Sequence, residues 1–250
     1  MMPSNNHVLM LLLVLAMLVV LLGLVYIGLK RSNNPRAVGI TLLVSGLVLG
    51  WLGLTGGMAA SGFLQDFSGL PPRFLLIILP SIFVLVWFAR SKRLTSWLDA
   101  IPGHYFAYAQ IFRLPLELLL WKLFLDGLLP EQMTFSGYNF DVLTAVFAPV
   151  IAFGYFQRKK IPLRWAITWN IAGIMLVLVI VTIAITSTPS PLRLWDNEPA
   201  NTIIAHLPFV WLPAFLVPMA LMMHLASLRQ LLHGSVDAYE LPSDAYELKS

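Results

Sequence analysis

Residues 104–130 have the sequence HYFAYAQIFRLPLELLLWKLFLDGLLP. This segment is apolar enough and long enough to cross a bilayer, yet it carries Arg113, Glu117, Lys122 and Asp126. At about 1.5 Å of rise per residue, Arg113 and Glu117 lie roughly 14–20 Å from its start, near the middle of a hydrocarbon layer about 30 Å thick. A charge at that depth is costly and needs a partner or water. We therefore expect the rest of the chain to be arranged around this segment.

The overall composition is that of an integral membrane protein. Of the 250 residues, 58% are hydrophobic and 11% are charged, whereas soluble domains carry about 25% charged residues. The apolar residues form long runs, which points to a lipid bilayer as partner rather than to a large soluble core. The net charge of +4 follows the loops, so we expect no nucleic-acid surface. The absence of cysteine excludes disulfides and cysteine-ligated metal centres, and we expect no cofactor.

Seven apolar runs predict an all-α integral membrane protein, a seven-transmembrane-helix bundle over residues 1–234. The first run is too long for a signal peptide and follows no basic residue. Residues 235–250 repeat the letters DAYEL, contain a proline and have no apolar face, so we interpret them as a disordered acidic tail, either native or added for expression. The predicted spans are about 8–29, 37–60, 74–90, 104–128, 142–157, 165–186 and 206–228.

The basic residues alternate between loops in one consistent pattern. The loops 30–36, 90–93 and 157–164 are strongly basic, and an even number of predicted spans separates each from the next. The intervening loops hold only Arg73 and Arg193 as basic residues, together with the acidic residues Asp66, Glu131, Asp141, Asp196 and Glu198. Because basic loops stay in the cytoplasm, the pattern predicts an N-terminus outside and a cytoplasmic C-terminus.

One face of the fourth span carries the main candidate site. At 100° per residue, Gln110, Arg113 and Glu117 fall on the same side of a helix. Lys122 and Asp126 fall near the opposite face at the outer end, where their side chains can reach water.

Three interpretations of Arg113 and Glu117 remain open. The two residues form a structural ion pair that fixes the packing of helices, or they line a wet cavity that binds a small polar ligand or ion. In the third interpretation Glu117 exchanges protons during transport. Pro115 lies between them and bends or loosens the helix, which favours a cavity.

Two further positions extend this candidate ligand or ion pathway. Asn170, about one turn into the sixth span, is placed to form a hydrogen bond across to another helix, with the fourth span as the expected partner. Glu198 and His206 belong to the segment 194–206 and are expected at an outer mouth of the site. The alternative for this segment is a capped and solvated loop, since it lacks the spacing of a tight metal site.

Histidines at matched depths would also allow a haem pair inside the membrane. His104 and His224 both fall near the cytoplasmic ends of predicted spans, but no further motif supports this interpretation. The seventh span has no lysine that could hold retinal. We therefore predict neither group.

The second span is rich in small residues at a spacing of four. Gly46 and Gly50, and again Gly53 and Gly57, form GxxxG pairs that let a partner helix approach closely. The alternative is that these glycines are merely tolerated in an apolar helix.

Three segments, 116–145, 169–185 and 197–232, resemble an uncharacterised family of bacterial multi-pass inner-membrane proteins. The resemblance covers about the C-terminal half of the chain. It implies a location in the bacterial inner (cytoplasmic) membrane and no particular activity.

Two functional hypotheses follow. The first is a small transporter or ligand-binding membrane protein with a polar site on the fourth span. The second is a non-transporting membrane partner or assembly protein in which the ion pair is structural. An enzyme is the weakest interpretation, because no phosphate-binding loop, HExxH or GxSxG motif is present.

Overall fold

The structure is a computed structural model that describes residues 4–91 and 95–239. All regular elements in these ranges are helical, and none is a β-strand. The α-helices are α1 (Ser4–Arg31), α2 (Ala37–Ala60), α3 (Leu75–Arg90), α4 (Thr95–Asp99), α5 (Gly103–Ala109), α6 (Arg113–Leu125), α7 (Val142–Ile151), α8 (Leu163–Thr186) and α9 (Val217–Tyr239). Short 3-10 segments are η1 (Phe63–Gln65), η3 (Gln110–Phe112), η4 (Glu131–Met133) and η6 (Ile203–Ala205), and π-helical turns are η5 (Ala152–Gln157) and η7 (Leu212–Leu216). The prediction of an all-α protein is therefore confirmed.

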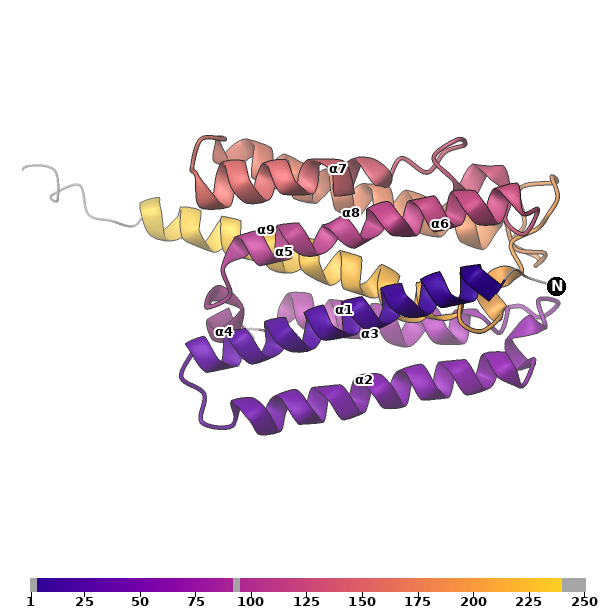
Figure 1. The fold of residues 1–250 in the computed structure, drawn as a ribbon, viewed down its shortest axis with the longest axis horizontal. Helices are drawn as coiled ribbons and strands as arrows, with labels where there is room; N and C mark the ends of the chain where they lie inside the picture. The colour runs from indigo at the N-terminus through magenta and orange to yellow at the C-terminus, as the bar shows by residue number, and fades with distance from the viewer. Residues whose placement is uncertain (1–3, 92–94, 240–250) are drawn as a thin grey trace, which may run out of the picture.

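The long helices run side by side along one axis (Figure 1). Within the part of the chain that the structure describes, four helical segments are long and apolar enough to cross a membrane: Asn5–Arg31, Ala37–Ala60, Leu163–Thr186 and Leu212–Leu232. Two shorter apolar segments, Leu75–Arg90 and Val142–Gln157, match the predicted third and fifth spans closely. Each of the seven predicted spans thus corresponds to a helical segment, and four of them meet the length and hydropathy of a full span.

The segment predicted as the fourth span is one helical path with an irregular centre. It runs from α5 through the 3-10 segment η3 into α6. Pro115 has no N–H to offer the carbonyl of Ile111 four residues earlier, which favours the tighter turn at that point. At the far end, Gly127 adopts a φ of 69°. The amide of Leu128 bonds the carbonyl of Leu123, which closes the helix in a Schellman arrangement.

The seventh predicted span begins later and ends later than expected. Residues 206–211 are mainly turns, and the helical path starts with η7 at Leu212. The reason is Pro208, which disfavours a helical conformation in the residue before it. At the other end α9 extends to Tyr239, so its last residues include the first part of the expected tail. The remainder of that tail, 240–250, lies outside the described residues.

Both α9 and α6 lie at the centre of the bundle. Half of the residues in the most apolar stretch of Leu212–Leu232 are buried, compared with 11% in α2. The helix α9 packs against α3, α5 and α8, whereas α6 packs against α1 and α7. In Figure 1, α2 lies at one edge of the bundle and α7 near the opposite edge.

The hairpin of α1 and α2 is fastened to the rest of the bundle by two tryptophans. Pro218 has no N–H, so the carbonyl of Ala214 lacks its ordinary α-helical donor. Trp51 Nε1 donates to this carbonyl oxygen at 3.0 Å. In the reverse direction, Trp211 Nε1 donates to the carbonyl oxygen of Leu52 at 3.0 Å. The two bonds join the middle of α2 to the beginning of the α9 path.

Candidate functional site

The buried centre of the site is an ion pair between α6 and α7. Arg113 is 1% exposed and Asp141, directly before α7, is 6% exposed. Arg113 Nε donates to Asp141 Oδ2 at 2.7 Å, and Arg113 Nη2 donates to Asp141 Oδ1. This two-point geometry matches the planar guanidinium to the carboxylate and is the strongest form of such a pair.

The third guanidinium nitrogen connects the pair to α9 and α8. Arg113 Nη1 lies 3.1 Å from His224 Nε2, and His224 Nδ1 lies 3.0 Å from Asn170 Oδ1. Because Arg113 is a donor only, His224 Nε2 accepts, so Nδ1 carries the proton and donates to Asn170. Asn170 Nδ2 then donates to Ser227 Oγ at 3.0 Å. The edge of Trp169 covers the ring of His224, with 4.9 Å between ring centroids.

Glu117 belongs to a separate branch of the network. It is 1% exposed, and its Oε2 accepts a hydrogen bond from Asn139 Nδ2 at 2.7 Å. Asn139 Oδ1 accepts from the backbone N–H of Asp141 at 3.1 Å, so this asparagine connects the Glu117 carboxylate to the backbone at the start of α7. Within the described residues no hydrogen bond reaches Glu117 Oε1.

The expected ion pair between Arg113 and Glu117 is therefore not formed. Arg113 pairs with Asp141 instead, and all four described salt bridges leave Glu117 out. By contrast, Lys122 and Asp126 form the predicted partly exposed pair, with 2.7 Å between Nζ and Oδ2.

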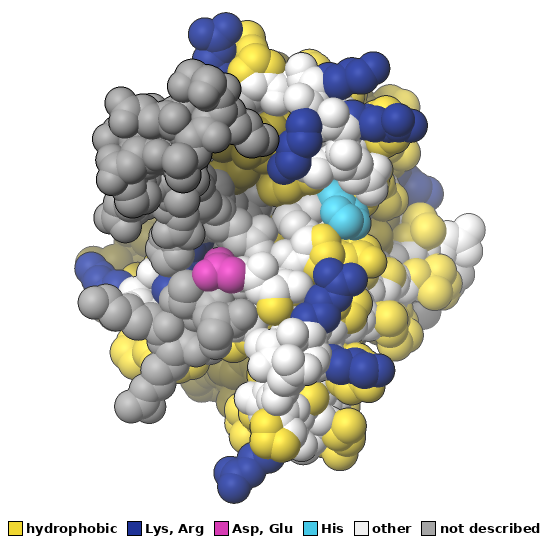
Figure 2. Space-filling model, turned by 90° about the vertical axis from the view of Figure 1, so that its left-hand side faces the viewer, with side chains coloured by type: hydrophobic (Ala, Val, Ile, Leu, Met, Phe, Trp, Pro, Cys, Tyr) yellow, Lys and Arg dark blue, Asp and Glu magenta, His cyan; other side chains and the backbone are white. Residues whose placement is uncertain are grey.

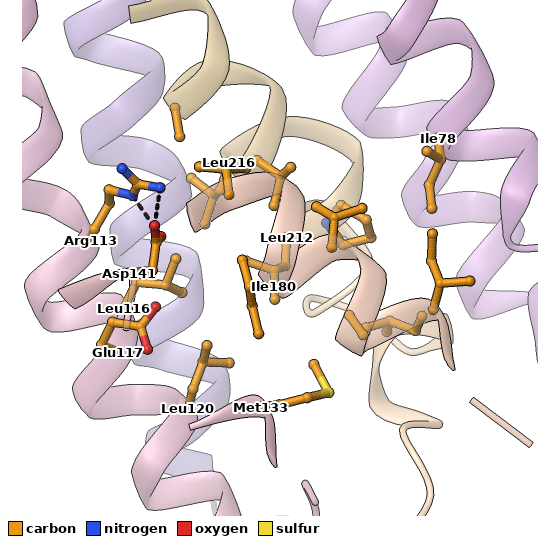
Figure 3. A pocket seen from close by; sticks show the side chains of 18 of the residues that line it. Ile78, Arg113, Leu116, Glu117, Leu120, Met133, Asp141, Ile180, Leu212 and Leu216 are labelled. Atoms are coloured by element: carbon orange, nitrogen blue, oxygen red, sulfur yellow. Dashed lines mark hydrogen bonds and ion pairs between the residues drawn. The ribbon is translucent and has the colours of Figure 1, made fainter. Parts of the chain in front are cut away.

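A pocket of about 70 Å³ lies next to these groups. Arg113, Asp141 and Glu117 lie along one side of it, and the labelled side chains across the pocket are aliphatic (Figure 3). The walls come from α3, α6, α8 and the η7–α9 path. At about 30 Å³ for each molecule of liquid water, the pocket has room for roughly two waters or a small chemical group.

The remaining predicted site residues divide into two groups. Gln110 and Asn170 are fully buried, but neither lines the pocket. Gln110 Nε2 donates to the carbonyl of Ala220 at 3.0 Å, while its Oε1 has no hydrogen-bond partner. Asn170 forms the expected hydrogen bond between helices, although its partners lie on α9 rather than on the fourth span.

Glu198 and His206 do not form a mouth to this pocket. Glu198 is paired with Arg193, with 2.8 Å between Oε1 and Nη2, and its Oε2 accepts from the amide of Ala200. These two donors lower the pKa of Glu198 below its usual value. His206 Nδ1 lies 3.0 Å from the carbonyl oxygen of Thr202. The alternative interpretation of a capped loop fits these contacts better than a cation site.

The histidines do not form a haem pair. Both ring nitrogens of His224 are engaged by Arg113 and Asn170, so neither is available to an iron atom. His104 lies against Tyr105, with 4.5 Å between ring centroids.

Sequence reasoning missed Asp141, Asn139 and His224 as members of the network. A signal for Asp141 was present. The predicted fifth span, 142–157, extends about 24 Å as a helix, less than the thickness of the hydrocarbon layer. A span shorter than the layer draws its flanking residues toward the apolar region, which is the signal that the sequence offered for Asp141.

A family model described as a domain of unknown function, DUF8737, matches residues 71–232. The chain belongs to the DUF8737 family. The matched segment of this DUF8737 protein includes the whole polar network and pocket, whereas α1 and α2 precede it. The expected resemblance to an uncharacterised family is confirmed to that extent. No curated protein and no solved structure matches the DUF8737 chain.

Proposed function

We propose that this protein is a small transporter or ligand-binding membrane protein whose intramembrane site is the pocket at Glu117. The observation that carries the proposal is a buried carboxylate next to an apolar pocket: Asn139 bonds one of its oxygens, and no described residue bonds the other. Buried ionisable groups in a membrane bundle are costly and mark ligand or ion pathways. Arg113 and Asp141 are paired with each other beside the pocket, and we do not assign them a direct contact with the ligand.

The membrane arrangement we propose has seven spans, an outer N-terminus and a cytoplasmic C-terminus, in a bacterial inner membrane. The clustering of basic residues supports it, because loops 30–36 and 157–164 and the end of α3 lie at the same end of the bundle (Figure 1). Among the described residues on that face, Lys and Arg side chains predominate over Asp and Glu side chains (Figure 2). Fusions to the C-terminus test the orientation. If the C-terminus is cytoplasmic, we expect a fused green fluorescent protein to fluoresce and a fused alkaline phosphatase to be inactive.

The natural absence of cysteine makes the pocket directly testable. Leu116 and Leu212 line it, whereas Leu123 is fully buried elsewhere. We expect Leu116→Cys and Leu212→Cys to react with methyl methanethiosulfonate, a small neutral reagent, much faster than the control Leu123→Cys in membranes. Equal and slow reaction at all three positions would show that the pocket is sealed and that the proposed site is wrong.

Transport requires a second measurement. We expect a proton or substrate flux into proteoliposomes that is lost in Glu117→Gln and kept in the control Glu131→Gln, since Glu131 is exposed and outside the pocket. A reactive pocket without any flux would favour ligand binding over transport.

The second candidate function is a membrane partner or assembly protein. The observation in its favour is that an added Cβ at Gly46, Gly50, Gly53 or Gly57 would meet no atom within 4 Å, so this side of α2 is free for another helix. Co-purification of one partner that is lost in Gly50→Leu would support it. Intact assembly in Gly50→Leu would exclude this surface.

A further inference from the structure

The charges beside the pocket restrict the kind of ligand that it can take. Asp141 uses both carboxylate oxygens to accept from Arg113, and each of the three guanidinium nitrogens is already engaged by Asp141 or His224. Arg113 and Asp141 therefore neutralise one another. Glu117 is the remaining acidic residue of the lining, and the lining contains no other Lys, Arg or His. An anionic head group would face this carboxylate, and the one cationic group of the lining, Arg113, already has its charge balanced by Asp141.

The hydrogen-bonding capacity of the site points the same way. Glu117 Oε1 accepts no hydrogen bond within the described residues. A cation bound beside it would hold the carboxylate in its ionised form, which can only accept hydrogen bonds. A ligand group that donates hydrogen bonds and carries a positive charge satisfies both the oxygen and the charge. A primary ammonium group has three such donors, which makes it the simplest match.

The walls of the pocket differ from its polar side in burial and chemistry. Near Glu117 the lining is fully buried, with Leu116, Leu120 and Met133. Along α8 the lining is aliphatic and only half-buried, at Ile180, Val181, Ala184 and Ile185. The lining thus leads from a buried carboxylate to the apolar side of the bundle, where an integral protein meets lipid.

The volume limits how much of a ligand the enclosed part can hold. About 70 Å³ accepts an ammonium head and one or two methylene groups. A longer chain would continue along the half-buried aliphatic side chains of α8.

From these observations we infer that the Glu117 pocket binds a single-chain alkyl amine, with the ammonium group on Glu117 and the alkyl chain along α8. This inference rests on the proposed function, because it names the ligand class of the same site. The ligand enters from the apolar phase of the membrane rather than from water.

The test uses two photoreactive probes of equal chain length in lipid nanodiscs at neutral pH. One is dodecylamine and the other is dodecanoate, each with a diazirine on the chain. We expect the amine probe to label residues 177–185 of α8 at least tenfold more than the carboxylate probe, and excess unlabelled dodecylamine to suppress that labelling. Glu117→Gln should reduce the amine labelling at least tenfold, while Glu131→Gln should leave it unchanged.

A second variant guards against a folding defect in Glu117→Gln. Ala184→Trp fills the aliphatic part of the pocket without touching the carboxylate, and we expect it to abolish labelling as well. Preferential labelling by dodecanoate, or amine labelling that persists in Glu117→Gln, would overturn the ligand class and leave the pocket as a binding site. Absence of labelling by both probes together with unreactive Leu116→Cys would overturn the proposed function itself. Absence of labelling with a reactive Leu116→Cys would overturn only the amine inference.

Discussion

Arg113 and Asp141 are 28 residues apart in the chain and meet as a buried two-point ion pair between α6 and the start of α7. Both side chains are buried, at 1% and 6% exposure, so neither charge is solvated by bulk water. Its contribution depends on both members being present, because one buried charge alone is far more costly than the pair.

Asp141→Asn should therefore destabilise the protein strongly. Loss of the negative charge leaves Arg113 buried without a counter-charge, which typically costs about 3–5 kcal/mol. The free energy of unfolding in mixed micelles measures this, with Asp126→Asn as the control because Asp126 pairs with the half-exposed Lys122. The double variant Arg113→Met/Asp141→Leu should recover much of the loss. Equal effects of Asp141→Asn and Asp126→Asn would contradict the buried pair.

Gly173→Ala should disturb the α8–α9 contact at His224. A Cβ at Gly173 would overlap the His224 ring, whose position is fixed by Arg113 and Asn170. Overpacking of this kind typically costs about 1–3 kcal/mol. The comparison is Gly50→Ala, where nothing lies within 4 Å of the added carbon. A native melting temperature for Gly173→Ala would show that the histidine ring is free to move.

Trp51→Phe should weaken the attachment of the α1–α2 hairpin through one hydrogen bond. The indole N–H donates to the carbonyl of Ala214. Its loss should lower the free energy of unfolding by about 1 kcal/mol beyond the change in packing. Pro218→Ala restores an N–H four residues after Ala214 and should make Trp51→Phe less damaging. A double-mutant cycle on these two positions measures the coupling. Strict additivity would mean that the indole does not substitute for the missing amide.

The pairing of Glu198 with Arg193 should make the stability of the loop between α8 and η6 sensitive to acid. Because the pKa of Glu198 is lowered in the folded protein, its stabilising effect is present above the usual value of 4.5 and is lost as pH falls through the lowered pKa. Acid unfolding monitored by the fluorescence of Trp195, whose backbone carbonyl also binds Arg193, should report this. Glu198→Gln should remove that part of the pH dependence. An unchanged profile of stability against pH would show that the Glu198–Arg193 pair does not stabilise the loop.

The helices are predicted well from the sequence because residues that end a helix follow the apolar runs. Gly127 ends α6, and the basic loop after Ala152–Gln157 ends the fifth segment. The partners of the buried charges were harder to predict, since helical periodicity orders residues only within one helix. Arg113 and Glu117 share a face, but their partners come from 139–141, a segment that looks like an ordinary polar loop. Its burial depends on how deep α7 begins, which only the packed bundle fixes.

The two tryptophan bonds have a consequence for how the chain is put together. The DUF8737 match contains Ala214 and Pro218, while Trp51 and Leu52 precede it. Each piece supplies an indole donor whose acceptor is a backbone carbonyl of the other piece. The hairpin is therefore joined to the rest much as one subunit is joined to another. A gene split within residues 61–70 should yield two polypeptides that recognise each other and reassemble.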